Sequence, residues 1–472
     1  MGGLSKEVRA VAERFLCFLN ASPSPYHAAD QCSKLLRNAG FQELKETEPW
    51  NLQPKGKYFL TRNKSTVIAF AVGGAWFPGN GFTMLAAHTD SPCLKVKPKS
   101  AMKNGGCHQV RVMPYGGGIW RSWFDRDLSV AGRVVYKKET DELVHALVNL
   151  ERPLLAIPSL AIHLETAEER EKFKLNKEDH LKPILATQYI EDQLQTKSDQ
   201  CENGKEHHHP GFLNLIAAQL GTSGDRILDY DLCLFDVQNA QLVGLHSEFV
   251  AGARLDNLVG SFTAITALIE SCCGEDGQSL DGDTNIRYVC CFDNEEVGSE
   301  TAQGACSSLT QWVLRRLSVG PEASPTALEE AIAQSMLISA DQAHALHPCY
   351  MGKYEDSNRA EFHKGVVVKI NANQRYATSA VTHAILKDIA NTADVPLQPF
   401  VVRNDSPCGS TVGPILAAKL GLSTVDVGTT QLAMHSIREL ADVSGIAQAI
   451  TLYKAFFQRY PQVFSRFSYA DS

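Results

Sequence analysis

The sequence lacks the features that would place the chain in a membrane, outside the cell or on nucleic acid. Its longest apolar stretch, Val67 to Phe77, is broken by Gly73-Gly74 and is too short to span a bilayer. No secretion signal is evident and no CxxC pair occurs among the 13 cysteines. Reduced thiols and a cytoplasmic setting are therefore expected. The net charge of −8 argues against a nucleic-acid surface.

Two common catalytic signatures are also missing. We find neither the GxSxG elbow of serine hydrolases nor a phosphate-binding P-loop. The chain has 472 residues, 44% of them apolar and 21% charged, which is typical of a globular protein with two or three domains.

The two ends of the sequence alternate between helical and strand patterns. Apolar residues recur at helical spacing at Val8, Val11 and Phe15, and again from Leu258 to Ile269. Buried-strand patterns occupy these segments: Tyr58 to Leu60, Thr66 to Val72, Phe82 to Ala87, Ile286 to Phe292, Met336 to Ala340, Val366 to Ile370, Phe400 to Val402 and Ser423 to Val427. This alternation predicts an α/β fold with a mixed, mainly parallel sheet sandwiched by helices.

The middle of the chain has a different pattern. Short β-like runs, such as Gln109 to Met113, Leu128 to Tyr136 and Leu154 to Leu164, predict an inserted β-rich domain. We expect catalytic-domain parts at residues 1–98 and 248–472, with the insert at 99–247. A charged stretch from Thr166 to Pro210 predicts a mobile loop, and its His207-His208-His209 run favours a solvated segment over a metal site.

The pair Glu295-Glu296 directly follows the apolar run Ile286 to Phe292. Two carboxylates at the mouth of a buried strand repel each other unless a cation or a proton offsets their charge. In extended backbone they would point in opposite directions, so that one could hold a metal while the other faces a water. A solvated acidic pair in a loop is the alternative.

A histidine and an aspartate close another apolar strand. His88 and Asp90 are two residues apart and lie on one face of an extended segment. Asp90 can then accept the second ring N–H of a metal-bound His88 and so fix its tautomer. The local sequence fits a polar turn after a strand equally well.

Three more residues complete a candidate set. Asp256 stands between apolar residues and is a candidate bridging carboxylate, although a helix N-cap is its commoner role. Asp341 follows the strand Met336 to Ala340, where a solvated turn is the alternative, and His435 follows a loop rich in Gly and Thr, where a packed histidine is the alternative. Each signal is weak, but two imidazoles and three carboxylates together, with Glu295 left as a base, suit two zinc-like ions.

The order and surroundings of these residues resemble the aspartyl aminopeptidases, cocatalytic zinc exopeptidases related to the tetrahedral aminopeptidases, in their cytosolic, mammalian type. The resemblance spans essentially the whole chain. It rests on Ser22-Pro23-Ser24-Pro25, His88-Thr89-Asp90-Ser91-Pro92, Arg254-Leu255-Asp256-Asn257, Asn294-Glu295-Glu296-Val297-Gly298-Ser299 and Met434-His435-Ser436-Ile437-Arg438-Glu439.

The resemblance implies a fold of the zinc-exopeptidase type and a role for each ligand. His88 and Asp341 would hold one divalent metal, Glu296 and His435 the other, and Asp256 would bridge them, with a cis peptide at Asp256-Asn257. Zn²⁺ is the expected metal, with Mn²⁺ or Co²⁺ also compatible at one site. Glu295 would be the general base that activates a metal-bound water.

The resemblance also implies a substrate and an assembly. Peptides with N-terminal Asp or Glu would bind through Lys369, with Tyr376 and His344 as further contacts and with Glu295 and Asp341 facing the substrate. The insert would be a dimerisation domain whose His163 reaches the substrate site of a neighbouring subunit in a tetrahedral homododecamer. No nucleic-acid or membrane partner is expected.

Without the resemblance, local alternatives stay open for two of these residues. Lys369 reads as a strand-edge lysine that reaches water, and His163 as a structural histidine. For the whole chain, a metallopeptidase of other specificity, such as a neutral aminopeptidase, is the alternative enzyme. A catalytically inert assembly protein that keeps the fold is the alternative outside enzymes.

Overall fold

The computed structural model describes residues 5–194, 207–273, 279–320, 322–466 and 468. The chain divides into two compact units. The first comprises residues 1–90, 240–434 and 439–472, and the second comprises residues 91–239 and 435–438. The dimerisation role expected for residues 99–247 stays a prediction.

A nine-stranded mixed sheet forms the centre of the first unit, in the order β1-β2-β3-β13-β4-β14-β18-β16-β17. Its strands are β1 (Gln42–Glu43), β2 (Lys57–Arg62), β3 (Thr66–Val72), β4 (Phe82–His88), β13 (Ile286–Phe292), β14 (Met336–Ala340), β16 (Val366–Lys369), β17 (Leu397–Phe400) and β18 (Ser423–Gly428). The pairs β13-β4, β4-β14 and β14-β18 are parallel, so that three successive pairings at the middle of the sheet run in one direction. The expected mixed, mainly parallel α/β sheet is confirmed.

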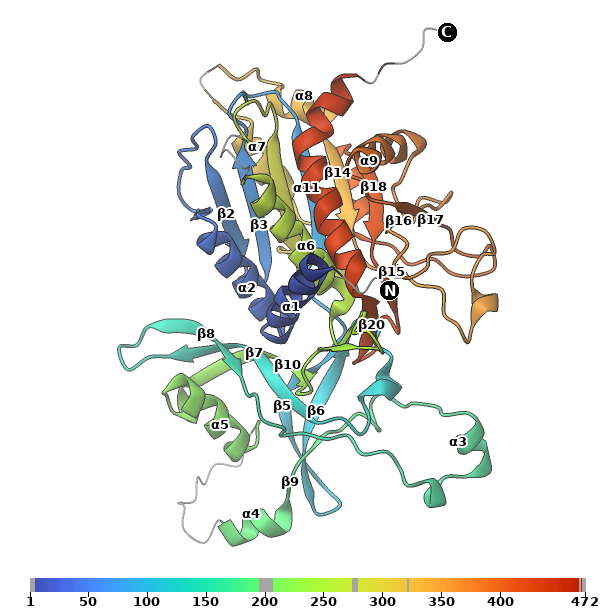
Figure 1. The fold of residues 1–472 in the computed structure, drawn as a ribbon. Helices are drawn as coiled ribbons and strands as arrows, with labels where there is room; N and C mark the ends of the chain where they lie inside the picture. The colour runs from blue at the N-terminus through green and yellow to red at the C-terminus, as the bar shows by residue number, and fades with distance from the viewer. Residues whose placement is uncertain (1–4, 195–206, 274–278, 321, 467, 469–472) are drawn as a thin grey trace. The chain divides into compact units, whose positions relative to one another are not determined.

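Helices cover both faces of this sheet because its strands are apolar on both sides. On one face Val67, Ala69 and Ala71 pack with α1 (Lys6–Asn20), α2 (Pro25–Asn38), α6 (Leu255–Ser271), α9 (Ala380–Thr392) and α11 (Val443–Ser465). On the other face Ile68 and Phe70 pack with α7 (Leu309–Leu317), α8 (Ala327–Ala333) and α10 (Val412–Leu420). Figure 1 shows α6 and α11 side by side across the strands.

A second, smaller sheet of the first unit has the order β11-β12-β20-β19-β15. Its strands are β11 (Gln241–Val243), β12 (Phe249–Gly252), β15 (Ala343–His344), β19 (Thr430–Leu432) and β20 (Glu439–Asp442). The chain passes directly from the large sheet into this one, because β15 begins three residues after β14 ends.

The second unit is built on a six-stranded antiparallel sheet in the order β8-β7-β10-β5-β6-β9. Its elements are β5 (Cys93–Asn104), β6 (Cys107–Tyr115), β7 (Leu128–Lys137), β8 (Leu143–Asn149), α3 (Ala167–Glu171), β9 (Ile184–Thr187), α4 (Gln188–Leu194), α5 (Pro210–Leu220) and β10 (Ile227–Asp236). Its core holds Trp120, Trp123, Phe212 and Ile216. The expected β-rich character of this region is present.

Two local expectations for this unit are wrong. Leu154 to Leu164 is no strand: it forms isolated bridges at Leu155 and Ala156 and a 3-10 turn at Ile162–Leu164, since Pro153 and Pro158 have no N–H to donate to a ladder. His209 is also buried rather than solvated, with its ring 4.7 Å from that of His108. Residues 195–206 of the charged stretch, expected to be a mobile loop, lie outside the described residues.

Within the described part of the chain, no helix combines the length and apolar composition needed to cross a bilayer.

Candidate metal centre

Three adjacent parallel strands, β13, β4 and β14, deliver polar residues to one edge of the large sheet. His88 is the last residue of β4, Asp341 comes directly after β14, and Glu295 and Glu296 follow β13. Because the strands are parallel neighbours, their carboxyl ends meet. The structure thus brings together residues that lie more than 200 positions apart in the sequence.

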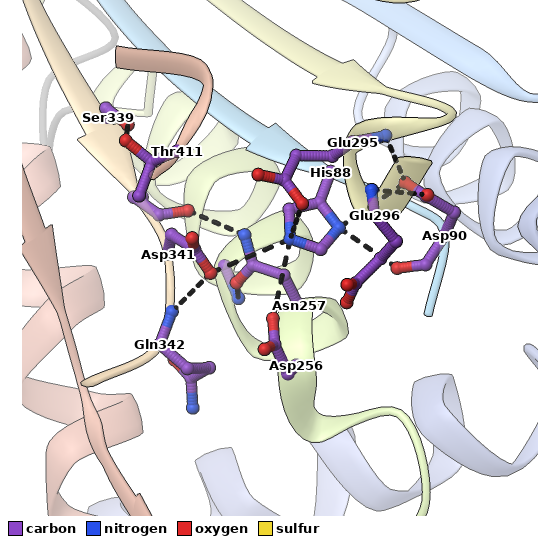
Figure 2. A network of polar contacts seen from close by, with 12 residues as sticks. His88, Asp90, Asp256, Asn257, Glu295, Glu296, Ser339, Asp341, Gln342 and Thr411 are labelled. Carbon is purple, nitrogen blue, oxygen red and sulfur yellow. Dashed lines mark hydrogen bonds and ion pairs between the residues drawn. The ribbon is translucent and has the colours of Figure 1, made fainter. Parts of the chain in front are cut away.

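His88 lies at the centre of this group and is 1% exposed. Its Nδ1 lies 3.0 Å from the backbone carbonyl of Asp90, which can only accept, so that neutral His88 carries its proton on Nδ1. Its Nε2 lies 3.4 Å from Asp256, 3.6 Å from Asp341 and 3.7 Å from Glu295 (Figure 2). Three carboxylates therefore face the nitrogen that neutral His88 offers as a ligand.

Asp90 supports the site through its backbone as well as through its carboxylate. Its backbone carbonyl accepts the Nδ1–H of His88 at 3.0 Å, and its carboxylate lies 3.4 Å from the same nitrogen. The two carboxylate oxygens also accept the backbone N–H groups of Glu295 and Glu296, at 3.1 Å each. Asp90 thereby fixes both the imidazole and the turn that carries the two glutamates.

The Glu295-Glu296 pair is not in extended backbone, so that expectation is wrong. Asn294 has φ +64°, so the extended backbone of β13 does not continue beyond it. Glu295–Val297 then form a 3-10 turn. Figure 2 shows the two side chains leaving this turn in different directions. The division between the two carboxylates therefore arises from the turn rather than from strand alternation.

Asn257, the neighbour of Asp256, caps the start of α6. Asn257 Oδ1 accepts the N–H of Gly260 at 3.1 Å, and Asn257 Nδ2 donates to the carbonyl of Ala340 at 2.7 Å. The Asp256-Asn257 peptide is cis, as expected. A Cβ at Gly260 would lie 2.3 Å from Asn257 Oδ1, so only glycine fits where α6 packs against the end of β14.

Glu439 is a supporting residue that our sequence reasoning did not single out. It is buried, and its Oε2 accepts the backbone N–H of Asp256 at 3.1 Å. Its place in the motif Met434 to Glu439 was the only signal in the sequence that could have indicated it.

The residues fit a zinc ion by chemistry and by spacing. His88, Asp256 and Asp341 each offer one ligand atom within 4.8 Å of the others, and so do His88, Glu295 and Glu296. Ligands about 2.0–2.2 Å from a tetrahedral zinc lie roughly 3.3–3.6 Å from one another. The separations of 3.4 and 3.6 Å at His88 Nε2 match that spacing.

The electrostatics of the group also call for a positive charge. Burial, together with the facing Asp341, Asp90 and Asp256, raises the pKa of Glu295 to about 8. Burial alone would lower the pKa of His88, but Glu295, Asp256 and Asp341 raise it well above its ordinary value. Both shifts favour the protonated forms, and a bound cation would offset the same negative charge.

A buried lysine adjoins the acidic cluster. Lys369, the last residue of β16, is 3% exposed, and its Nζ lies 3.8 Å from Asp341 Oδ2. The same Nζ lies 5.4 Å from the centre of the Tyr376 ring, which is also buried. His344 is exposed, and its ring contacts that of Phe400 with centres 6.2 Å apart. Lys369 thus does not reach solvent, which was its local alternative.

His163 and His435 belong to the second unit. His163 is exposed in the turn Ile162–Leu164. The Nδ1 of His435 lies 3.0 Å from the carbonyl of Gly117, which makes Nε2 the unprotonated nitrogen of the neutral ring. Their roles at the metal centre of the first unit stay predictions.

Comparisons with known proteins give the chain a family. The family model described as Aminopeptidase I zinc metalloprotease (M18) matches residues 18–457. An aspartyl aminopeptidase of Caenorhabditis elegans is 55% identical, and one of Aspergillus oryzae is 45% identical, each over 97% of this chain and 97% of the relative.

Solved structures agree with the sequence relatives. Ape4, in its complex with Nbr1, superposes with a TM-score of 0.95 at 42% identity, over 100% of this chain and 90% of that one. A subunit of the S. cerevisiae mApe1 dodecamer superposes with a TM-score of 0.84 at 26% identity, over 98% and 99%. A chain with this edge of imidazole and carboxylates and with these relatives belongs to the M18 aminopeptidase I family of zinc metalloproteases.

Proposed function

We propose that the chain removes N-terminal aspartate or glutamate from peptides. The observation that carries this proposal is the buried ammonium of Lys369 beside the carboxylate of Asp341. A buried cation next to the metal centre offers a partner for an acidic side chain at the substrate's N-terminus. The relatives from Caenorhabditis elegans and Aspergillus oryzae, both aspartyl aminopeptidases, support the same specificity.

The ligand roles are part of the proposal. His88 and Asp341 would hold one divalent ion, Glu296 and His435 a second, and Asp256 would be shared by both. The separations around His88 Nε2 support the first of these groups. Bound there, zinc would polarise the scissile carbonyl and acidify a water.

Glu295 would act as general base and then as general acid. It lies beside the ligand set, and its backbone is held by Asp90. Burial and the neighbouring carboxylates raise its pKa to about 8, and a nearby cation would lower that value, so that the carboxylate could exchange protons near neutral pH. It would take the proton of the attacking water and deliver it to the leaving amine. Asp341 would also face the free amine of the substrate.

The protein would act as a homododecamer in the cytoplasm. One neighbour in structure is a subunit of the mApe1 dodecamer, which supports a homododecamer here. In such an assembly His163 would contribute to the site of another subunit. Tyr376 and His344 would contact the substrate beside Lys369. A cytoplasmic setting remains our expectation from the cysteine content, and cell fractionation tests it.

The experiment compares peptides that differ only at the N-terminal residue or its amine. The zinc-loaded enzyme should release Asp and Glu from free N-termini and leave N-acetylated peptides intact. A chelator should remove the activity, and added zinc should restore it. Hydrolysis of acetylated peptides, or activity that survives complete metal removal, would contradict an aminopeptidase of this kind.

A further inference from the structure

Asp426 is a buried carboxylate next to Lys369, and it has no role in the proposed reaction. It lies on β18 and is 0% exposed. In the sheet it pairs with Lys369 of β16 on one side and with Ser339 of β14 on the other. Paired residues of neighbouring strands project to the same face, so Asp426 stands in a row with the lysine and a serine two residues before Asp341.

The Asp426 carboxylate holds the backbone of the segment that bears Tyr376. Its Oδ2 accepts the N–H of Ala377, the next residue, at 2.6 Å. The backbone N–H of Asp426 donates to Thr378 Oγ1 at 3.0 Å. Tyr376, whose ring covers the Lys369 ammonium, is therefore followed by two residues anchored on Asp426.

The same carboxylate fixes a second segment. Its Oδ1 accepts the hydroxyl of Thr411, the N-cap of α10. A Cβ at Gly413 would lie 2.5 Å from Oδ1, so the first turn of α10 packs directly against the carboxylate. The negative charge at this helix N-terminus is electrostatically favourable.

The two segments are also tied to each other beside the lysine. Arg375 Nε donates to the carbonyl of Cys408 at 3.3 Å, and Ser410 Oγ donates to the carbonyl of Arg375 at 3.1 Å. Asp426 thus anchors the segment that bears Tyr376 and the start of α10, and it pairs with Lys369 in the sheet.

We propose that Asp426 is a positioning residue for acidic specificity, which holds Tyr376 and Lys369 in the geometry that receives a substrate carboxylate. It touches no substrate itself. This inference rests on the proposed function, because it assumes that Lys369 binds the N-terminal acidic side chain. A purely structural Asp426 would instead affect all substrates alike.

The test is steady-state kinetics of full-length, zinc-loaded Asp426→Asn with the 7-amido-4-methylcoumarin derivatives of aspartate and alanine. Asparagine keeps the shape of the side chain but has a single acceptor oxygen. It can therefore replace only one of the two carboxylate oxygens that accept from Ala377 and Thr411. We expect kcat/KM for the aspartyl substrate to fall roughly 10-fold, mainly through KM, since small displacements of binding groups have effects of this size. The alanyl substrate should change by less than about 2-fold.

Two further variants keep the result decisive. Thr411→Val removes one donor at nearly constant volume, should lower the Asp-to-Ala ratio in the same direction, and decides the matter if Asp426→Asn does not fold. Lys369→Met separates this inference from the proposed function. If Lys369→Met abolishes the preference while the Asp426 and Thr411 variants keep it, or lower both substrates equally, the positioning role is overturned and the proposed function stands. If the wild type shows no preference for aspartate, both fail.

Discussion

One carboxylate oxygen of Asp90 accepts the backbone N–H of Glu295 at 3.1 Å. The other oxygen accepts the N–H of Glu296 at the same distance, and the carbonyl of Asp90 lies 3.0 Å from Nδ1 of His88. One residue therefore orients a ligand imidazole, a ligand carboxylate and the general base of the proposed site. Substitution of Asp90 should therefore act indirectly, by displacing His88, Glu295 and Glu296.

Asp90→Asn should weaken metal binding without removing a ligand. The amide presents one acceptor and one donor, so that one of the two N–H groups loses its partner. Loss of such an outer-shell partner typically lowers metal affinity by about 10–100-fold. Zinc affinity, measured by competition with a chromophoric chelator, checks this expectation, and wild-type affinity in a correctly folded variant would count against it.

Glu295→Gln should keep the metal and remove nearly all turnover. The glutamine retains the shape of the side chain but cannot take up the proton of a water. Metal analysis and kcat for an aspartyl substrate give the two measurements. Glu300→Gln, five residues along on an exposed position, is the matched control and should behave as wild type. Wild-type turnover by the Glu295 variant would show that the base is another group.

Lys369→Met should lower hydrolysis of acidic substrates far more than of neutral ones. The methionine keeps the bulk of the stem, so the loss reports the charge, and we expect an effect of about 10–100-fold in kcat/KM for an aspartyl substrate. Lys364→Met, on an exposed neighbouring lysine, is the control. Equal losses for aspartyl and alanyl substrates would remove Lys369 from the specificity pocket.

His27 should make the fold sensitive to mild acid. Burial lowers the pKa of His27 to about 4, with nearby Arg254 and Lys34 acting in the same direction and Asp30 opposing them. In the unfolded chain the group titrates near 6.5, so it favours folding fully above that pH, and this contribution is lost as the pH falls toward 4. At pH 5 the loss amounts to about 2 kcal/mol.

His27→Gln isolates this contribution, because glutamine does not titrate. The difference in melting temperature between pH 7 and pH 5 should be smaller for this variant than for wild type. His246→Gln, on an exposed position, should leave that difference unchanged. An identical pH dependence in wild type and His27→Gln would mean that His27 is protonated without penalty in the fold.

Much of the sheet could be predicted because its central strands are continuous apolar runs. Thr66–Val72, Ile286–Phe292 and Met336–Ala340 have the bounds that the sequence indicates. The strand expected at Phe400 to Val402 is displaced to Leu397–Phe400. The predicted strand began only after Pro399. The observed strand β17 includes this proline because β17 lies at the edge of the sheet, where proline removes no inward hydrogen bond.

The candidate ligands could be named from the sequence, but the way they are held could not. The turn before Glu295 depends on a local φ of +64° at Asn294. The contacts of Asn257 with Ala340 and of Glu439 with Asp256 join residues more than 80 positions apart. Asp426 was missed for the same reason. Nothing in Ser423 to Val427 indicates that its one acidic residue faces Lys369 on the neighbouring strand.

In the proposed site, the buried ammonium of Lys369 beside the metal centre selects an acidic N-terminal residue. The most direct measurement is the ratio of kcat/KM for two peptides that differ only in an N-terminal Asp or Asn, with the zinc-loaded wild-type enzyme. The two side chains have nearly the same size, so the ratio reports charge. We predict that the Asp peptide is preferred by about 10-fold or more. Equal rates, or a preference for Asn, would show that Lys369 does not select for negative charge.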